Sequence, residues 1–591
     1  MVFRRITLTI CMIVLGELSI QAETVRDFQT YLDAGYRALE AKKWDQAQGL
    51  FNKAIHCEPT NAEGFVALGQ LARLQGEWRR AQSYVAEALR CEADNLNAMV
   101  LDAEIKHFRG YDDLALERLQ LVLQGQPLHP SASMLRARIF IKQQKPLEAI
   151  LDLNTHLRIK PNDVEARRVR AQTNLQVQQY VAALQDFDVL VQLEPESYTV
   201  WKERAQVLSQ LDRWSEAVAD LSKALKLKPA EYELYWIRGL AYYQLEDYQQ
   251  CVLDLNRYLV TYPQSEEALF KRGEAYFHME KWDAALKDFQ AAVKIRPDND
   301  NAWIEIGRVY EKMQRNTDAL AAYKRVIEQE PNQHRARLYL ILLQQKMDQL
   351  DAALDGANHL VRVFQSFENV PQMPVILRLR SGVLGLMGRD IEALKDMNRA
   401  IELADDDALN YVVRAAIYRR QKQDPLALND LNHAAQLDPK ESHVFTQRAS
   451  YFISQKQWEL AKADYERVLQ MPPKQVTEMT RTYARINRHF MDKEFSEGKK
   501  LALHARSNHA KDPDWLYDLA CALAIGAEMA QQAGPGYSTE TAELQNSACE
   551  FLEQAFANGY CHKAHARNDP DFKSLHNVKR FVDLVQFQMD K

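Results

Sequence analysis

The side chains that could support catalysis or metal binding are few in this chain. The sequence contains no H-E-x-x-H zinc motif, phosphate-binding loop, G-x-S-x-G nucleophile elbow or CxxC pair. One cluster has ligand-like residue types, namely Cys561, His562 and His565, followed by Asp569 and Asp571. Zinc ligands are normally paired more tightly than this. We therefore interpret the cluster as a polar surface turn and predict no catalytic residue, no metal and no other cofactor.

A second chemical pattern lies in the spacing of charged residues. An arginine precedes an aspartate by sixteen residues at eight places, and at a further place the charges are exchanged, with Asp102 before Arg118. Duplication of one segment explains the eight copies but does not explain the exchange. The pattern therefore predicts ion pairs between neighbouring helices, which set the angle between them more than they stabilise the fold. The eight pairs are Arg136 and Asp152, Arg170 and Asp186, Arg204 and Asp220, Arg238 and Asp254, Arg272 and Asp288, Arg380 and Asp396, Arg414 and Asp430, and Arg448 and Asp464.

The elements that carry these pairs recur every 34 residues. Most repeats end with a proline, and we call this position, or its equivalent in the other repeats, the phase position. The residue twelve positions before it is alanine in twelve of the thirteen repeats and cysteine, Cys251, in the remaining one. Twenty-four residues before it stands Gly, Ala or Ser in twelve repeats of thirteen, and Ile341 in the tenth. The thirteen phase positions are Pro59, Ala93, Pro127, Pro161, Pro195, Pro229, Pro263, Pro297, Pro331, Gln365 and, after a slip of six residues, Asp405, Pro439 and Pro473.

The repeat at 269–297 shows what one copy encodes. It is predicted to form two short amphipathic helices joined by a tight turn. Gly273 and Ala285 are small residues, one on each helix, which allow the two backbones to pack closely, and Tyr276 and Phe289 complete the buried seam. Proline at the phase position ends the second helix, because proline cannot continue the hydrogen-bond ladder.

These features resemble the tetratricopeptide repeat (TPR) family, whose unit is a helix–turn–helix of 34 residues. The resemblance covers roughly residues 29–474. It implies an all-α fold, a right-handed superhelix of about thirteen units, with a concave groove lined by the first helix of each unit. It also implies binding of a protein or peptide partner, and it does not imply chemistry.

The resemblance also implies which side chains line the groove. They stand 27, 23 and 20 residues before the phase position, and at these sites we expect Lys202, Trp236, Tyr243, Phe270, Phe277 and Arg308. Large aromatic side chains there predict an anchor for apolar groups of a partner, although burial by the next helix is an equally good interpretation. The lysine–asparagine carboxylate clamp of chaperone-binding members is missing, since Gln206 and Leu240 replace asparagine.

Two regions depart from the regular array, which we assign to residues 23–475. The tenth repeat, within 335–375, has Ile341 for the usual small residue and Ala357 for the usual bulky one, so we expect it to pack least well and open first. The phase is lost after Pro473. For 476–591 we predict a helical extension with one degenerate pair, Asp514–Gln531 and Thr539–Asn558, and a closing cap.

The first 22 residues are typical of a secretory signal. Arg4 and Arg5 precede an apolar run that is too short to span a membrane comfortably, and Ala22 offers a cleavage site. We therefore predict an exported, periplasmic protein without a transmembrane span in the mature chain. The alternative is a cytoplasmic protein whose start only looks like a signal. We predict no disulfide, although a bridge between Cys521 and Cys549 is conceivable.

Composition and charge narrow the function further. The chain has 591 residues, 47% of them hydrophobic, with a net charge of −6 and a pI near 6.2, so it lacks the basic excess that a nucleic-acid partner requires. We predict a non-catalytic scaffold that binds a polypeptide. The least favoured alternative is an enzyme with its site in 476–591, a region that is short and appears to be a cap.

Overall fold

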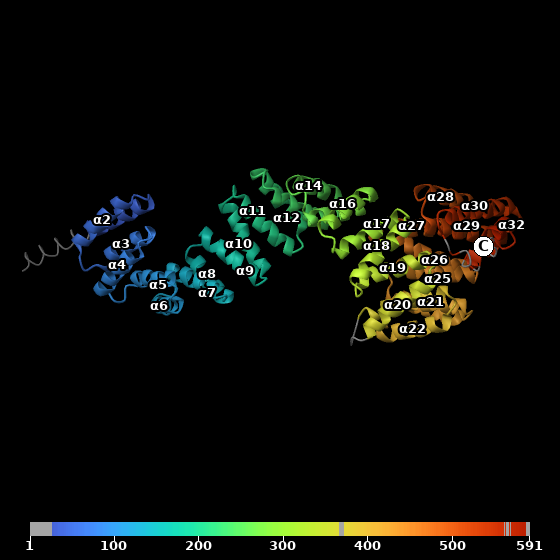
Figure 1. Ribbon diagram of the computed structural model, residues 1–591, viewed down its shortest axis with the longest axis horizontal. Helices are drawn as coiled ribbons and strands as arrows, with labels where there is room; N and C mark the ends of the chain where they lie inside the picture. The colour runs from blue at the N-terminus through green and yellow to red at the C-terminus, as the bar shows by residue number, and fades with distance from the viewer. Residues whose placement is uncertain (1–26, 366–370, 561, 563–565, 568, 587–591) are drawn as a thin grey trace, which may run out of the picture. The chain divides into compact units, whose positions relative to one another are not determined.

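Helices of 13 and 14 residues alternate along most of the protein, as the 34-residue period predicts. The computed structural model describes residues 27–365, 371–560, 562, 566–567 and 569–586 (Figure 1). Helices account for 81% of the described residues, which contain no strand. The predicted all-α repeat fold is therefore confirmed.

The chain divides into two compact bodies, Met1–Met279 and Glu280–Lys591, which we call the N-terminal and C-terminal bodies. In the N-terminal body a helix over residues 27–40 is followed by α2 (Trp44–Cys57), α3 (Ala62–Leu74), α4 (Trp78–Cys91), α5 (Leu96–Phe108), α6 (Asp112–Gly125), α7 (Pro130–Lys142), α8 (Pro146–Ile159), α9 (Val164–Gln176), α10 (Tyr180–Leu193), α11 (Tyr198–Gln210), α12 (Trp214–Leu227), α13 (Tyr232–Gln244), α14 (Tyr248–Thr261) and α15 (Glu266–His278).

The C-terminal body continues the alternation and then adds longer elements. It contains α16 (Trp282–Ile295), α17 (Asp300–Lys312), α18 (Asn316–Gln329), α19 (His334–Lys346), α20 (Leu350–Gln365), α21 (Met373–Leu386), α22 (Asp390–Leu403), α23 (Ala408–Arg420), α24 (Asp424–Leu437), α25 (Ser442–Ser454), α26 (Trp458–Gln470), η1 (Pro473–Gln475), α27 (Glu478–Met491), α28 (Phe495–Asn508), α29 (Pro513–Ala533), η2 (Pro535–Tyr537), α30 (Ser538–Ala557), η3 (Pro570–Leu575) and α32 (Lys579–Gln586).

The turn between the two helices of a repeat has a fixed geometry. One residue there takes a positive φ, and these residues recur every 34 positions, as in Gln144, Gln178 and Asp212. The left-handed residue ends the first helix in the manner of a Schellman motif, since the amide of Lys145 donates to the carbonyl of Phe140 at 2.8 Å. The turn therefore reverses the chain without leaving these groups unpaired.

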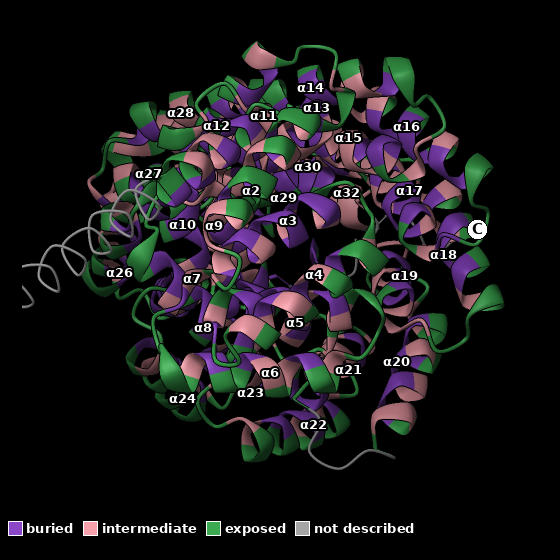
Figure 2. Ribbon diagram, turned by 90° about the vertical axis from the view of Figure 1, so that its left-hand side faces the viewer, coloured by how far each residue is buried: buried purple, intermediate pink, exposed green. Residues whose placement is uncertain are grey.

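The seam between paired helices depends on matched sizes. A Cβ atom at Gly35 would overlap the ring of Phe51, and one at Gly307 would overlap the ring of Tyr323. Both aromatic residues are fully buried. Figure 2 shows the buried residues gathered along the inner faces of the helices, with exposed residues on the outer faces and in the turns. Each repeat thus builds its own section of core from one small and one large side chain.

In the tenth repeat the expectation of a poorly packed seam is wrong. Ile341 and Ala357 are both fully buried and belong to the same hydrophobic cluster. The large and the small side chain have exchanged helices, so the volume of the seam is preserved.

Seven of the eight arginine–aspartate pairs form bidentate ion pairs between the two helices of one repeat. Their N–O distances lie between 2.6 and 2.8 Å, and every aspartate is buried. The exchanged pair also meets, with Arg118 Nε 2.9 Å from Asp102 Oδ2. In the remaining pair, Arg272 belongs to the N-terminal body and Asp288 to the C-terminal body.

The structure adds a third partner that the sequence analysis missed. The free guanidinium nitrogen of most of these arginines donates to a side chain on the second helix of the preceding repeat, as when Arg238 Nη1 donates to Ser222 Oγ at 2.9 Å. Asn154, Asp188, Asn398 and Asn432 accept in the same way. Each of these acceptors stands two residues after the paired aspartate of its own repeat. A search of the sequence for polar residues that recur at this position could therefore have found them. The arginine ladder thus ties each repeat to its predecessor.

One helix pair after Pro473 was also missed. Helices α27 and α28 form a further repeat whose turn residue, Lys493, again has a positive φ. Its turn lies 37 residues after that of the preceding repeat, Lys456, and Gly498 replaces the usual alanine, so the period does not reveal it. The predicted degenerate pair corresponds to α29 and α30, in which Ala520 and Ala548 are fully buried.

Candidate functional site

The predicted groove residues of the N-terminal body lie on the first helices of three successive repeats. Trp236 and Tyr243 come from α13, and Phe270 and Phe277 from α15. We call these four side chains the aromatic wall. Residues seven apart lie on one face of a helix, and all four are half-buried, neither enclosed in the core nor fully exposed.

Second helices and neighbouring rings hold the aromatic wall in place. The Trp236 ring centroid lies 5.6 Å from that of Tyr258 on α14. Tyr243 meets Tyr248 edge-on at 5.5 Å and lies 6.0 Å from His278. Trp236 and Tyr243 are therefore held by neighbouring rings, and a partner would meet these two side chains with little further loss of side-chain entropy.

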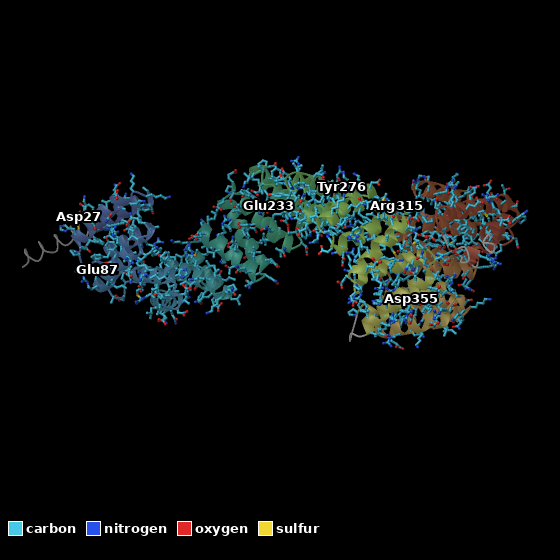
Figure 3. All side chains as sticks on the ribbon, in the orientation of Figure 1. Asp27, Glu87, Glu233, Tyr276, Arg315 and Asp355 are labelled. Carbon is cyan, nitrogen blue, oxygen red and sulfur yellow. The ribbon has the colours of Figure 1, made fainter. Side chains whose placement is uncertain are left out.

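The charges around the aromatic wall are neutralised by one another. Lys202 on α11 lies 3.4 Å from Glu233, whose position is labelled in Figure 3, and Lys271 lies 2.5 Å from Glu274. The Lys271 ammonium also sits 4.4 Å from the ring centroid of Tyr243, in cation–π geometry. This surface therefore offers rings and alkyl stems without a strong net field.

Arg308, the sixth predicted groove residue, belongs to the C-terminal body. Its guanidinium lies 2.6 Å from Glu305, which also pairs with Arg335 at 2.6 Å. It stands 5.7 Å from the ring centroid of Tyr339. These contacts give Arg308 a structural role in its own body.

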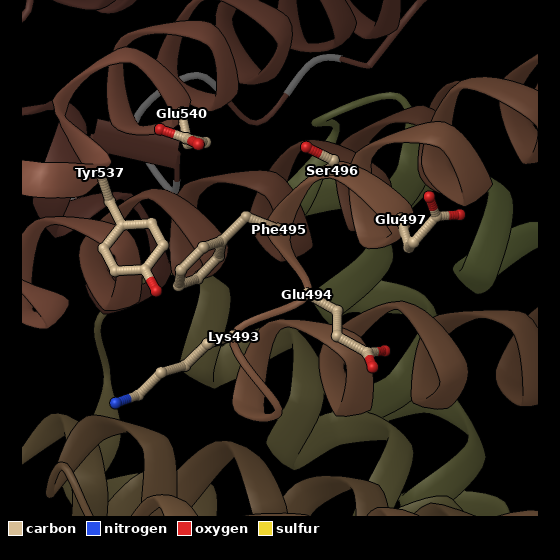
Figure 4. Close-up of a pocket in the computed structure, with 7 residues that line it drawn as sticks. All are labelled: Lys493, Glu494, Phe495, Ser496, Glu497, Tyr537 and Glu540. Atoms are coloured by element: carbon tan, nitrogen blue, oxygen red, sulfur yellow. The ribbon is translucent and has the colours of Figure 1, made fainter.

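A surface depression in the C-terminal body lies between the α27–α28 turn and the start of α30 (Figure 4). The rings of Phe495 and Tyr537 form its wall, 5.2 Å apart and edge-on. Two of its carboxylates have close partners, since Glu494 lies 2.6 Å from His489 Nδ1 and Glu497 lies 2.6 Å from the Lys500 ammonium. The depression contains no nucleophile paired with a base, so it does not have the geometry of a catalytic site.

The cluster that carries ligand-like residues is arranged for packing. Cys561 and His565 lie outside the described residues, and His562 Nδ1 lies 3.5 Å from Asp348. The Asp569 carboxylate accepts from the Tyr517 hydroxyl at 2.7 Å and caps η3 by accepting from the Asp571 amide at 3.0 Å. The predicted polar turn is thus a cap joined to α29.

Cys521 on α29 joins this cluster, and the sequence spacing gave no sign of it. Its sulfur lies 4.0 Å from Asp569 Oδ2. Burial, with the nearby Asp569, raises the pKa of the Cys521 thiol well above its usual range and raises the pKa of Asp571 to about 8. The Cys521 sulfur and carboxylate oxygens of Asp569 and Asp571 lie within 4.8 Å of one another, so these three side chains form a compact group of metal-ligand type. The five described cysteines, Cys521 and Cys549 among them, are free thiols.

Comparisons with known proteins agree with this architecture. Residues 172–240 and 304–357 match family models described as "Tetratricopeptide repeat", and residues 273–314 match one described as "TPR repeat". A search of curated proteins found no match. Within the described part of the chain, no helix is both long and apolar enough to cross a membrane.

Several solved structures are similar to parts of the chain. The Cut9 and Hcn1 hetero-tetramer of the APC/C aligns with 78% of this chain and 97% of its own, at 16% identity and a TM-score of 0.31. YrrB, titled "a TPR protein with an unusual peptide-binding site", aligns with 31% of this chain and 95% of its own, at 21% identity and a TM-score of 0.29. MamA from Desulfovibrio magneticus RS-1 aligns with 29% of this chain and 96% of its own, at 20% identity and a TM-score of 0.28.

Proposed function

Because the chain is a tetratricopeptide repeat protein, we propose that it is a non-catalytic scaffold which binds a polypeptide partner on the aromatic wall of its N-terminal body. Repeats of this family suggest protein–protein interaction. The single observation that carries the more specific proposal is the aromatic wall itself. Its four rings are partly exposed on consecutive first helices, and neighbouring rings hold Trp236 and Tyr243 in position. Partly exposed aromatic residues are effective binding anchors.

The choice of the N-terminal body has a second support. In the C-terminal body, the end of α19 is contacted by the chain's own closing elements, with Lys346 Nζ 3.1 Å from Asp514 and His562 near Asp348. A depression there is lined by both α19 and the segment after α30. The first helices of that body are therefore partly covered by its own cap.

A photo-crosslinking residue placed at Trp236 tests the proposal. We expect it to capture a discrete polypeptide in extracts of the source cells. The matched control carries the same residue at Leu253, which is 50% exposed on the second helix α14. Capture at both positions, or at neither, would contradict binding on the aromatic wall.

We further propose that the protein is exported and loses residues 1–22. The support is the charge and hydropathy pattern of that segment, which lies outside the described residues. N-terminal sequencing of the mature protein distinguishes export from the cytoplasmic alternative. A chain that begins near Glu23 supports export, and one that begins at Met1 in the cytoplasm contradicts it.

A further inference from the structure

A second ladder of contacts runs through both bodies, and it pairs a ring with a cation. The residue 28 positions before the phase position lies on the first helix and is often aromatic. The residue 22 positions after that aromatic one lies on the second helix and is often basic. Within one repeat the two then form a cation–π contact between the paired helices. Such pairs are Lys53 over Tyr31 at 5.7 Å, Arg257 over Tyr235 at 5.3 Å, Arg325 over Trp303 at 4.3 Å and Arg467 over Phe445 at 4.5 Å.

The twelfth repeat shows that histidine can replace the cation. There the ring of His433 meets that of Tyr411 edge-on, with centroids 4.6 Å apart. An aromatic partner tolerates a neutral imidazole and also attracts a protonated one. The contact therefore survives a change in the charge of the histidine.

In the tenth repeat both positions are basic. Arg337 on α19 stands where the aromatic residue belongs, and His359 on α20 stands where the cation belongs. His334 joins them from the start of α19. The Nε of Arg337, the Nδ1 of His334 and the Nε2 of His359 are each shielded from solvent, and none has a hydrogen-bond partner among the described residues. This repeat therefore lacks the cation–π contact that the preceding repeat has between Arg325 and Trp303.

Among the described residues, no carboxylate acts on the pKa of these three groups, which is lowered by burial and, for the two histidines, by the charge of Arg337. On α18, which packs against α19, Arg325 lies over the ring of Trp303. On α20 the nearby charge is Arg362, and the ring of Phe364 lies 4.5 Å from that of His334. One nitrogen of Arg337 donates to the carbonyl of Pro331, at 3.0 Å. On α17 the carboxylate of Glu305 is engaged by Arg308 and Arg335, and on α21 Arg380 is engaged by Asp396 and Asn358.

Protonation of the two histidines therefore opposes the closed repeat. Burial first, and then the charge of Arg337, lowers the pKa of both His334 and His359 below the ordinary 6.5. The unfolded or open repeat then binds protons more readily than the closed one. Stability is complete above pH 6.5 and falls as the pH drops below that value, until the lower folded-state pKa is passed.

We propose that the α19–α20 repeat is a pH-operated weak point of the C-terminal body, closed when His334 and His359 are neutral and opening locally when they gain protons. Opening would loosen the link between the repeats before and after it, and so change the surface that the C-terminal body presents. The inference rests on the contacts of this repeat alone and does not depend on the proposed partner site.

Hydrogen exchange on the full chain at pH 7.5 and pH 5.5, corrected for the intrinsic rate, tests the proposal. We expect protection across α19 and α20 to fall about tenfold or more, because both histidines gain protons more readily in the open repeat. The internal control is α23–α24, where His433 has its aromatic partner and protection should stay nearly constant. Equal changes in the two repeats, or none in α19–α20, would overturn the proposal.

Three variants separate the basic cluster from general acid sensitivity. R337Y restores the aromatic residue found at Tyr31, Tyr235 and Tyr411 and should remove most of the pH effect. H359K should leave α19–α20 weakly protected at both pH values. H562N removes the histidine that contacts Asp348 just after α19, and should leave the pH effect in place. A pH effect that persists unchanged in R337Y would contradict the role of Arg337.

Discussion

At the scale of single residues, the arginine ladder shows how a surface-like charge pattern becomes structural. The carboxylate of Asp254 is buried and accepts two hydrogen bonds from Arg238, whose third nitrogen reaches Ser222 in the preceding repeat. Exposed pairs contribute at most about 1 kcal/mol. Removing one partner of a buried pair costs more, because the other charge is left without compensation.

We predict that D254A lowers the free energy of opening α13 and α14 by about 3 kcal/mol. Hydrogen exchange of the amides in these helices measures it. The matched control is D188A, which removes another acceptor of the ladder, bound to Arg204 at 3.1 Å but 53% exposed. That change should cost less than about 1 kcal/mol. Equal losses in the two variants would show that burial does not set the strength of the ladder.

At the scale of elements, the sequence predicts regular repeats well and irregular ones poorly. Small residues at fixed spacing indicate where two helices meet, because a Cβ at such a position as Gly307 would strike the facing ring. The same rule misjudged the tenth repeat, since spacing does not show that Ile341 and Ala357 compensate each other. It also missed the α27–α28 repeat, where the η1 turn lengthens the step and Gly498 interrupts the alanine series.

The exchange of sizes in the tenth repeat can be tested by a double-mutant cycle. I341A alone removes a fully buried side chain and should cost about 2–5 kcal/mol in the free energy of unfolding. A357L alone overpacks the seam and should cost about 1–3 kcal/mol. The double variant restores the ordinary arrangement and should cost clearly less than the sum. Strict additivity in hydrogen exchange of α19 and α20 would show that the two residues do not share one space.

At the scale of the whole molecule, the sequence predicts an array of binding repeats more readily than it predicts the binding surface. The register of the repeats placed Trp236 and Phe270 on first helices, as the structure has them. Their partial exposure depends on rings and charges from neighbouring helices, such as Tyr258 and Lys271, which spacing alone does not specify. The pattern in residues 1–22, on which the proposed export rests, is separate from the pattern of the repeats.

The central claim is that the aromatic wall holds the partner, and the most direct measurement is the affinity of the purified, crosslinked partner for a W236A/F270A variant. Aromatic anchors contribute about 2 kcal/mol or more each, so the two together contribute about 4 kcal/mol, and we predict that binding weakens by about a thousandfold. The circular dichroism of the variant should be unchanged, and L253A on α14 should bind like the native protein. Unchanged affinity in W236A/F270A, or loss of its helical signal, would assign these rings to the core and contradict the account.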